Sequence, residues 1–232
     1  MRSTYEELPV GTRPTRFRVA ISLLNIFAGL ALVAALGAQV VDQSVNNRFG
    51  EGNSFAYISI QVSVAGIIVL LAGGIYGLRS RLDTRILAIV RANFAAFSLL
   101  IVAAHSTLLT IVGRDDRIFV GGLQWAETIT EIIVPTFVIL EWMINPYRPR
   151  VPRWTPLIGL AYPIIWLAAT LVRGSITDWY PYDLSVLAWD SGWVASSLYF
   201  GTLGLALLLF LLLVMMANRI HYRLLPRNKF ES

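Results

Sequence analysis

Three glutamates in one apolar stretch of this chain, residues 121–144, are the side chains best suited to chemistry. A carboxylate in hydrocarbon costs at least about 2.5–3.5 kcal/mol, so such residues normally face a protein interior or a wet cavity and are candidates for function. The spacing of Glu127, Glu131 and Glu141 places them on one stripe of a helix, and we expect this stripe to point inward. Glu127 and Glu131 lie one turn apart, and two carboxylates this close in a low dielectric should not both be ionised.

A hydroxyl and an imidazole are predicted to lie at the same depth as these carboxylates. Counted from the expected outer end of each apolar run at 1.5 Å per residue, Ser59 lies about 6 Å deep, Glu127 about 9 Å, His105 about 12 Å and Glu131 about 15 Å. A hydroxyl beside a base is the arrangement that nucleophilic catalysis requires. Further candidates for binding a substrate near this layer are Gln61, Ser63, Glu127, Thr130, Arg173, Tyr180 and Tyr182. Of these, Arg173, Tyr180 and Tyr182 are expected to form a lid.

Each of these polar residues also has an ordinary structural explanation. Serine and threonine hydroxyls in membrane helices most often bond the carbonyl one turn back, and a lone histidine is most often a satisfied packing residue. At the other end of the same stretch, Glu141 is expected to pair with Arg148 or Arg150. Arg91 is expected to extend its long side chain to the same surface.

The elements that must position these groups are predicted to be transmembrane helices. Hydrophobic residues make up 56% of the chain and charged residues 14%, and the apolar residues come in blocks. Each block has roughly the 18 or more residues that cross a bilayer core about 30 Å thick, and backbone hydrogen bonding in lipid then requires helices. The six predicted spans are 17–41, 55–78, 86–112, 121–144, 156–172 and 192–217.

The distribution of basic residues predicts the orientation of these spans. Of the nineteen lysines and arginines, fifteen fall on the side that holds both termini and four on the other. Because cytoplasmic connections are enriched in Lys and Arg, we expect both termini in the cytoplasm. The prediction is an all-α membrane protein with a cytoplasmic tail at 1–16, a six-helix transmembrane domain at 17–217 and a basic cytoplasmic tail at 218–232. The net charge of +5 then reflects topology rather than nucleic-acid binding.

Motifs for metal or cofactor chemistry are missing from the sequence. The chain has no cysteine, which excludes disulfides, thiolate ligands and a cysteine nucleophile, and its two histidines cannot form a multi-histidine metal site. It also lacks the glycine-rich nucleotide motifs, the nucleophile elbow and the zinc-protease motif. We therefore expect no metal and no cofactor, and we expect membrane lipids as partners.

Three short patterns follow one another along the second to sixth predicted spans. They are the run 55–61 (FAYISIQ), the pair 134–135 (VP) followed by 141–142 (EW), and the pair 173–174 (RG) leading to 179–182 (WYPY). In this succession the chain resembles the bacterial predicted six-helix membrane proteins called the Pr-six-Pr family. That family is distantly similar to the androgen-induced, FAR-type membrane proteins of animals, which hydrolyse fatty-acid esters of hydroxy fatty acids with an intramembrane threonine and a histidine. The resemblance implies a lipid-ester hydrolase of a bacterial plasma membrane.

The chain departs from the family pattern at two positions. Ser59 stands where threonine is usual, which keeps the hydroxyl, so the resemblance implies Ser59 as the nucleophile. The histidine expected just before Pro135 is missing, and Thr130 or Glu131 occupies its place. The base is then expected to be Glu131 or, from the third span, His105, with Gln61 or Ser63 as oxyanion donor.

Three functions of different classes are compatible with the sequence. The first is an intramembrane hydrolase of fatty-acyl esters, and the second is a non-catalytic lipid-binding or structural protein, which the missing histidine favours. The third is a proton-coupled carrier that uses Glu127 and Glu131 as a relay, although the sequence has no internal repeat. A shared cavity in the outer half would favour the hydrolase, dry packing the structural protein, and a path to the cytoplasmic face the carrier.

Overall fold

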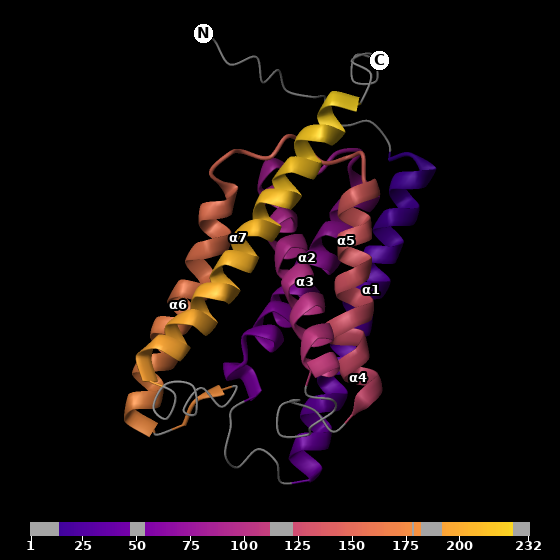
Figure 1. The fold of residues 1–232 in the computed structure, drawn as a ribbon. Helices are drawn as coiled ribbons and strands as arrows, with labels where there is room; N and C mark the ends of the chain where they lie inside the picture. Colours follow the sequence, from indigo (N-terminus) through magenta and orange to yellow (C-terminus); the bar gives the residue numbers. More distant parts are fainter. Residues whose placement is uncertain (1–13, 47–53, 112–122, 178, 182–191, 225–232) are drawn as a thin grey trace.

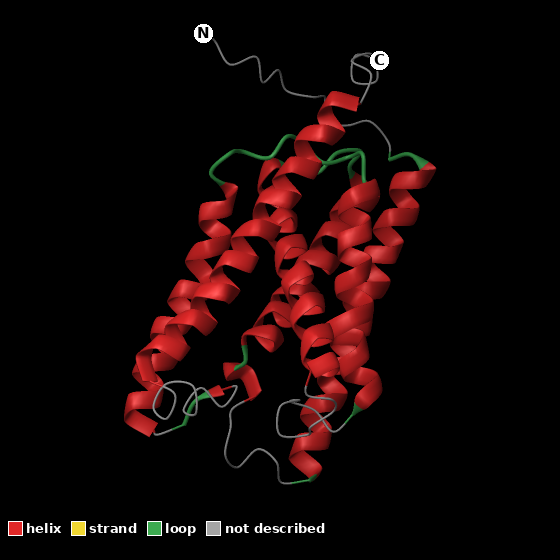
Figure 2. Ribbon diagram, in the orientation of Figure 1, coloured by secondary structure: helices red, strands yellow, loops and turns green. Residues whose placement is uncertain are grey.

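The computed structural model describes residues 14–46, 54–111, 123–177, 179–181 and 192–224, and within these residues all regular elements are helical (Figure 1, Figure 2). Thr15 caps the first helix by accepting a hydrogen bond from the Arg18 N–H at 3.2 Å. The elements are α1 (Arg16–Val45), η1 (Ser54–Ala56), α2 (Ile58–Arg79), α3 (Arg85–Ile111), α4 (Gln124–Thr128), η2 (Ile129–Ile133), α5 (Val134–Ile144), α6 (Thr155–Thr177) and α7 (Gly192–Leu224).

Five of the described helices, α1, α2, α3, α6 and α7, are long and apolar enough to cross a membrane, which indicates a multi-pass membrane protein. α1 begins and α7 ends at the same end of the bundle, the upper end in Figure 1. The helices start close to the predicted boundaries, but α6 continues to Thr177 and α7 to Leu224. Residues 218–224 of the predicted C-terminal tail are therefore helical.

The fourth predicted span differs from the others because it is not one continuous α-helix. α4 passes into a π-helical turn, η2, and then into α5. In this turn the N–H of Val134 donates to the carbonyl of Ile129, five residues back. Pro135 explains the wide turn, because it has no N–H for the carbonyl of Glu131 and its ring pushes that carbonyl aside. Such turns often mark functional sites, and Glu131 lies at the centre of this one.

The glutamate stripe of this segment points inward, as the sequence predicts. Glu127 and Glu141 are buried, as are Val134 and Val138 between them, and Glu131 is half-buried. The stripe packs against a core that α1, α2, α3 and α7 also build. Central members of this core are Leu32, Leu70, Ala92, Ala96, Val138 and Leu211.

α1 and α2 make the most extensive helix-to-helix contact in the described bundle. Two glycines of α2 allow this approach. A Cβ on Gly74 would lie 2.8 Å from the carbonyl oxygen of Ser22, and one on Gly77 would lie 2.2 Å from the Ser22 hydroxyl. Since any larger residue would push α1 away, these glycines are a packing device of the kind common between membrane helices.

Buried charges join α1, α3, α5 and the connection between α2 and α3, at the end of the bundle where α1 begins. Arg91 Nη1 donates to Glu141 Oε1 at 2.7 Å, and Asn145 donates to the same oxygen at 2.6 Å. Asp83 pairs with Arg18 and lies 3.7 Å from Arg91. We call this end, defined by Arg18, Asp83, Arg91 and Glu141, the paired end.

Two predictions about this end were wrong. Glu141 pairs with Arg91 and not with Arg148 or Arg150, and Arg91 is buried instead of extending to the surface. The reason lies on α2, where Gly73 leaves room for the guanidinium: a Cβ there would lie 2.3 Å from Arg91 Nη2. Arg148 instead lies over the ring of Trp142, with its guanidinium carbon 4.2 Å from the ring centroid.

Candidate functional site

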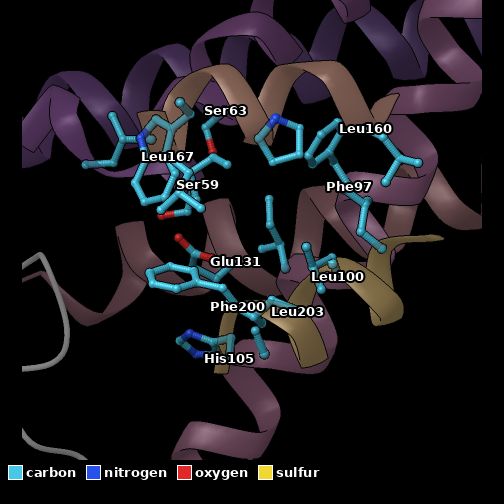
Figure 3. Close-up of a pocket in the computed structure, with 18 of the residues that line it drawn as sticks. Ser59, Ser63, Phe97, Leu100, His105, Glu131, Leu160, Leu167, Phe200 and Leu203 are labelled. Carbon is cyan, nitrogen blue, oxygen red and sulfur yellow. The ribbon is translucent and has the colours of Figure 1, made fainter. Parts of the chain in front are cut away.

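A cavity of about 620 Å³ lies toward the opposite end of the bundle, among α1, α2, α3, the α4–η2 segment, α6 and α7 (Figure 3). We call this the cavity end. The volume falls within the range of roughly 300–1,000 Å³ that is typical of small-molecule sites. Most of the lining is apolar, with Phe97, Leu100, Leu167 and Phe200 among its members. The lining side chains with polar or titratable groups are Gln39, Ser59, Ser63, His105, Glu127, Thr130, Glu131 and Trp166.

Ser59 and Glu131 make the contact in this cavity that nucleophilic chemistry needs. The Ser59 hydroxyl donates a hydrogen bond to the Glu131 carboxylate, and the two side chains point toward each other in Figure 3. Ser59 is the second residue of α2, so it lies at the positive end of that helix dipole. Glu131 projects from the π-helical turn of η2. Of the two predicted bases, Glu131 thus accepts the hydrogen bond from the predicted nucleophile.

Three more predicted residues surround this pair. Glu127 is buried one turn before Glu131, close enough for their charges to interact. Thr130 is buried and donates its hydroxyl to the Glu127 carbonyl at 3.1 Å, which is the ordinary back-bonding role of a helical threonine. His105 reaches the cavity from α3 and, in the view of Figure 3, lies on the far side of Glu131 from Ser59. The cavity therefore brings together residues of α2, α3 and the α4–η2 segment.

Gln61, which we expected to bind substrate, is not among the residues that line the cavity. Its Nε2 donates to the carbonyl of Phe55 at 2.7 Å, and its Oε1 accepts from the Tyr162 hydroxyl at 2.6 Å. Trp166, also on α6, donates to the Ala56 carbonyl at 2.8 Å. Because both ends of its amide are engaged, Gln61 instead braces the start of α2 against α6 and so helps to position Ser59.

The predicted lid residues lie beyond the cavity lining where they are described. The guanidinium carbon of Arg173 is 4.8 Å from the ring centroid of Trp179, and that ring meets Tyr57 edge-on at 6.2 Å. Tyr180 packs against α6 at Gly174, where a Cβ would lie 1.9 Å from the tyrosine ring. These contacts place Trp179 beside the start of α2 and Tyr180 against α6, outside the cavity lining. Tyr182, the remaining predicted lid residue, lies outside the described residues.

Sequence reasoning missed the contributions of α1, α6 and α7 to this cavity. Gln39 on α1 is buried and lines it, and a polar residue inside an apolar run was a detectable signal. Pro163 of α6 and Gly201 and Gly204 of α7 also line it. Nothing in the sequence indicated their position, because proline and glycine are common in membrane helices whether they face lipid, protein or a cavity.

No family model, no curated protein and no solved structure matches this chain. The resemblance to the six-helix bacterial family therefore stays a hypothesis. The function has to be inferred from the cavity and from the contact between Ser59 and Glu131.

Proposed function

We propose that this membrane protein is an intramembrane hydrolase of fatty-acyl esters, with Ser59 as nucleophile and Glu131 as general base. The observation that carries the proposal is the hydrogen bond from the Ser59 hydroxyl to the Glu131 carboxylate inside a largely apolar cavity of about 620 Å³. The apolar lining suits an acyl chain, and the contact between hydroxyl and base suits attack on its ester. Together they favour acyl-ester chemistry over dry structural packing.

The proposed reaction has two halves that share one base. The Ser59 oxygen attacks the carbonyl carbon of the ester while its proton passes to Glu131. The bond from that carbon to the alcohol oxygen then breaks, and the alcohol leaves with the proton from Glu131. Water next attacks the acyl-Ser59 ester and gives a proton to Glu131, and this proton returns to Ser59 as the fatty acid departs. One water is consumed, and the products are one alcohol and one fatty acid.

The start of α2 provides the stabilisation that the attacked carbonyl oxygen needs. The N–H groups of a first helical turn point toward the N-terminal end and carry the positive end of the helix dipole. Ser59 lies in this turn, and Ser63 lines the cavity one turn further on. Since the Gln61 amide is engaged elsewhere, these groups are the expected oxyanion donors. Removing one such donor costs about 10²–10³ in kcat in a well-studied protease.

The direct test is treatment of the purified protein in detergent with a fluorophosphonate probe and with palmitoyl and octanoyl esters. We expect the wild type to be labelled and to cleave the esters, and Ser59→Ala to lose both properties. Ser44→Ala is a matched control, because Ser44 is an exposed serine on α1 whose hydroxyl bonds the Val40 carbonyl. A folded wild type that neither reacts with the probe nor cleaves an ester would refute the hydrolase.

Lipid binding without catalysis is the second candidate function. It is favoured by the engagement of the Gln61 amide, which removes one of the two side-chain oxyanion donors expected from the sequence. A proton carrier has less support. In the described part of the chain, the lining of the cavity includes none of Arg18, Asp83, Arg91 or Glu141, so no polar path to the paired end is seen.

We further propose that the α4–η2–α5 segment is a sixth span and that both termini lie in the cytoplasm of a bacterium. The asymmetry of basic residues supports this orientation. Because the wild type has no cysteine, single cysteines report topology cleanly. In intact cells, Ser44→Cys near the end of α1 should react with an impermeant thiol reagent, and Arg150→Cys between α5 and α6 should be protected. The reverse pattern would contradict this orientation.

A further inference from the structure

Two large side chains line the cavity and are also strongly exposed. Ile164 on α6 is 65% exposed and Leu205 on α7 is 70% exposed, and both belong to the cavity lining. A side chain meets both conditions where a cavity opens to the outside. The cavity is therefore open to the side of the bundle next to α6 and α7, and in a bilayer this opening faces lipid tails.

Gly201 and Gly204 widen this opening on the α7 side. Both line the cavity, both are exposed, and a Cβ added to either would meet no atom within 4 Å. They differ in this respect from Gly74 and Gly77, whose faces are filled by α1. The space beside Gly201 and Gly204 is thus open to a molecule that comes from the bilayer.

The hydrogen bonds that attach α7 to α5 and to the connection after it lie at the paired end. Trp142 Nε1 donates to the Val214 carbonyl at 3.3 Å, and the Val151 N–H donates to Asn218 Oδ1 at 3.2 Å, which ties the second half of α7 to α5 and the connection after it. Only 17% of the most apolar part of α6 and 22% of that of α7 are buried, against 56% for α3. Figure 1 shows the lower halves of α6 and α7 leaning away from the other helices.

We propose that a long acyl chain enters the cavity sideways from the bilayer, past the exposed side chains of Ile164 and Leu205, and lies against Gly201 and Gly204. The inference rests on the proposed function for the ester that this chain presents to Ser59. A cavity of about 150 Å³ holds benzene, with six carbons, so 620 Å³ has room for on the order of twenty carbons. Gly201 and Gly204 are then specificity-determining residues, because a large side chain at either position shortens the acyl chain that fits.

Binding is tested with a palmitate that carries a photoactivatable diazirine, in phosphatidylcholine vesicles that contain the purified protein. We expect adducts on residues 160–167 and 200–208. Gly204→Trp should reduce their yield roughly tenfold. Gly37→Trp is the matched control and should leave the yield unchanged, because Gly37 is an exposed α1 glycine with an equally open Cβ position that does not line the cavity. Thermal midpoints check folding, and Gly204→Leu is the milder variant if the tryptophan variant does not fold.

Ester cleavage separates the failure of this proposal from the failure of the proposed function. Gly204→Trp should lower kcat/KM for a palmitoyl ester roughly tenfold more than it lowers kcat/KM for an octanoyl ester. Adducts at the opening without any ester cleavage would refute the hydrolase and support lateral binding.

Three outcomes would overturn lateral binding. The first is ester cleavage with the same palmitoyl-to-octanoyl ratio in Gly204→Trp and wild type. The second is a set of adducts spread evenly over all lipid-facing helices. The third is crosslinking between two copies of the chain at 200–208 in place of lipid adducts, which would assign the opening to a second copy.

Discussion

Glu131 and Glu141 stand on one segment of the chain, α4–η2–α5, yet their surroundings are opposite. Glu141 is buried at the paired end, where Arg91 and Asn145 donate to it at 2.7 and 2.6 Å. Glu131 faces the cavity, where it accepts a hydrogen bond from the Ser59 hydroxyl. The same type of side chain is thus an ion-pair partner at one end and a candidate base at the other.

The neighbours of a buried carboxylate decide its role. At Glu141 a full positive charge balances the carboxylate, and close packing leaves it outside the cavity lining. At Glu131 a neutral hydroxyl supplies one hydrogen bond, so the carboxylate keeps its capacity to take a proton. The cavity then gives a substrate access to it. The difference predicts that the two ends respond to substitution in different ways.

Glu131→Gln should have the largest effect on chemistry and little effect on the fold. Glutamine keeps the size of the side chain and can bond Ser59, but it cannot act as the base, so we expect ester hydrolysis to fall about 10²–10⁴-fold. Rates with an octanoyl ester and thermal midpoints in detergent measure the two effects. Glu127→Gln is the matched variant, since Glu127 lines the same cavity one turn away. We expect it to lower the rate of ester hydrolysis less than Glu131→Gln does. Equal losses in both variants would break the assignment of the base to Glu131 alone.

Glu141→Leu should have the opposite profile. It leaves Arg91 buried without its closest partner, and breaking a buried ion pair in this way costs about 3–5 kcal/mol of stability. We expect a lower thermal midpoint, with unchanged hydrolysis per folded molecule. The double variant Arg91→Met with Glu141→Leu should regain much of the loss, because no charge of this pair is left buried. A double variant less stable than Glu141→Leu would mean that Arg91 is held mainly by other contacts.

Two glycine substitutions should give the smallest contrast between the ends. Gly73→Ala brings a Cβ to 2.3 Å from Arg91 Nη2, whose guanidinium is held by Glu141, so we expect a loss of about 1–3 kcal/mol. Gly204→Ala meets no atom within 4 Å, and removing a helical glycine there should stabilise the protein by about 0.5–1 kcal/mol. Thermal midpoints of both variants test the contrast. A lower thermal midpoint in both variants would show that the cavity wall packs as tightly as the paired end.

Much of the fold and part of the site can be predicted from the sequence because a membrane constrains both. A span needs about 20 apolar residues, so local composition reveals it. The inward stripe follows from the free-energy cost of placing Glu127, Glu131 and Glu141 in lipid. Depth is also predictable, since each helical residue adds 1.5 Å. This is why Ser59, His105 and Glu131, chosen at similar depth, line one cavity in the structure.

Rotation and packing order of the helices are not available from depth alone. The sequence therefore left His105 and Glu131 as equal candidates for the partner of Ser59, and the structure gives the hydrogen bond to Glu131. For the same reason Gln61 was expected in the cavity but turns to Phe55 and Tyr162.

Where charge must be buried follows from the sequence alone, whereas the neighbour that each charge meets and the place where the bundle stays open depend on how the helices pack. Arg91 pairs with Glu141 because Gly73 of another helix leaves room for it. The opening beside α6 and α7 is bordered by residues such as Ile164 and Gly204, whose types fit lipid, protein core and cavity equally well. The environment of a polar group in a membrane can be predicted from the sequence, because placing that group in lipid costs several kcal/mol. An apolar group has a similar free energy in lipid, in the protein core and in a cavity, so its residue type does not indicate which of these it faces.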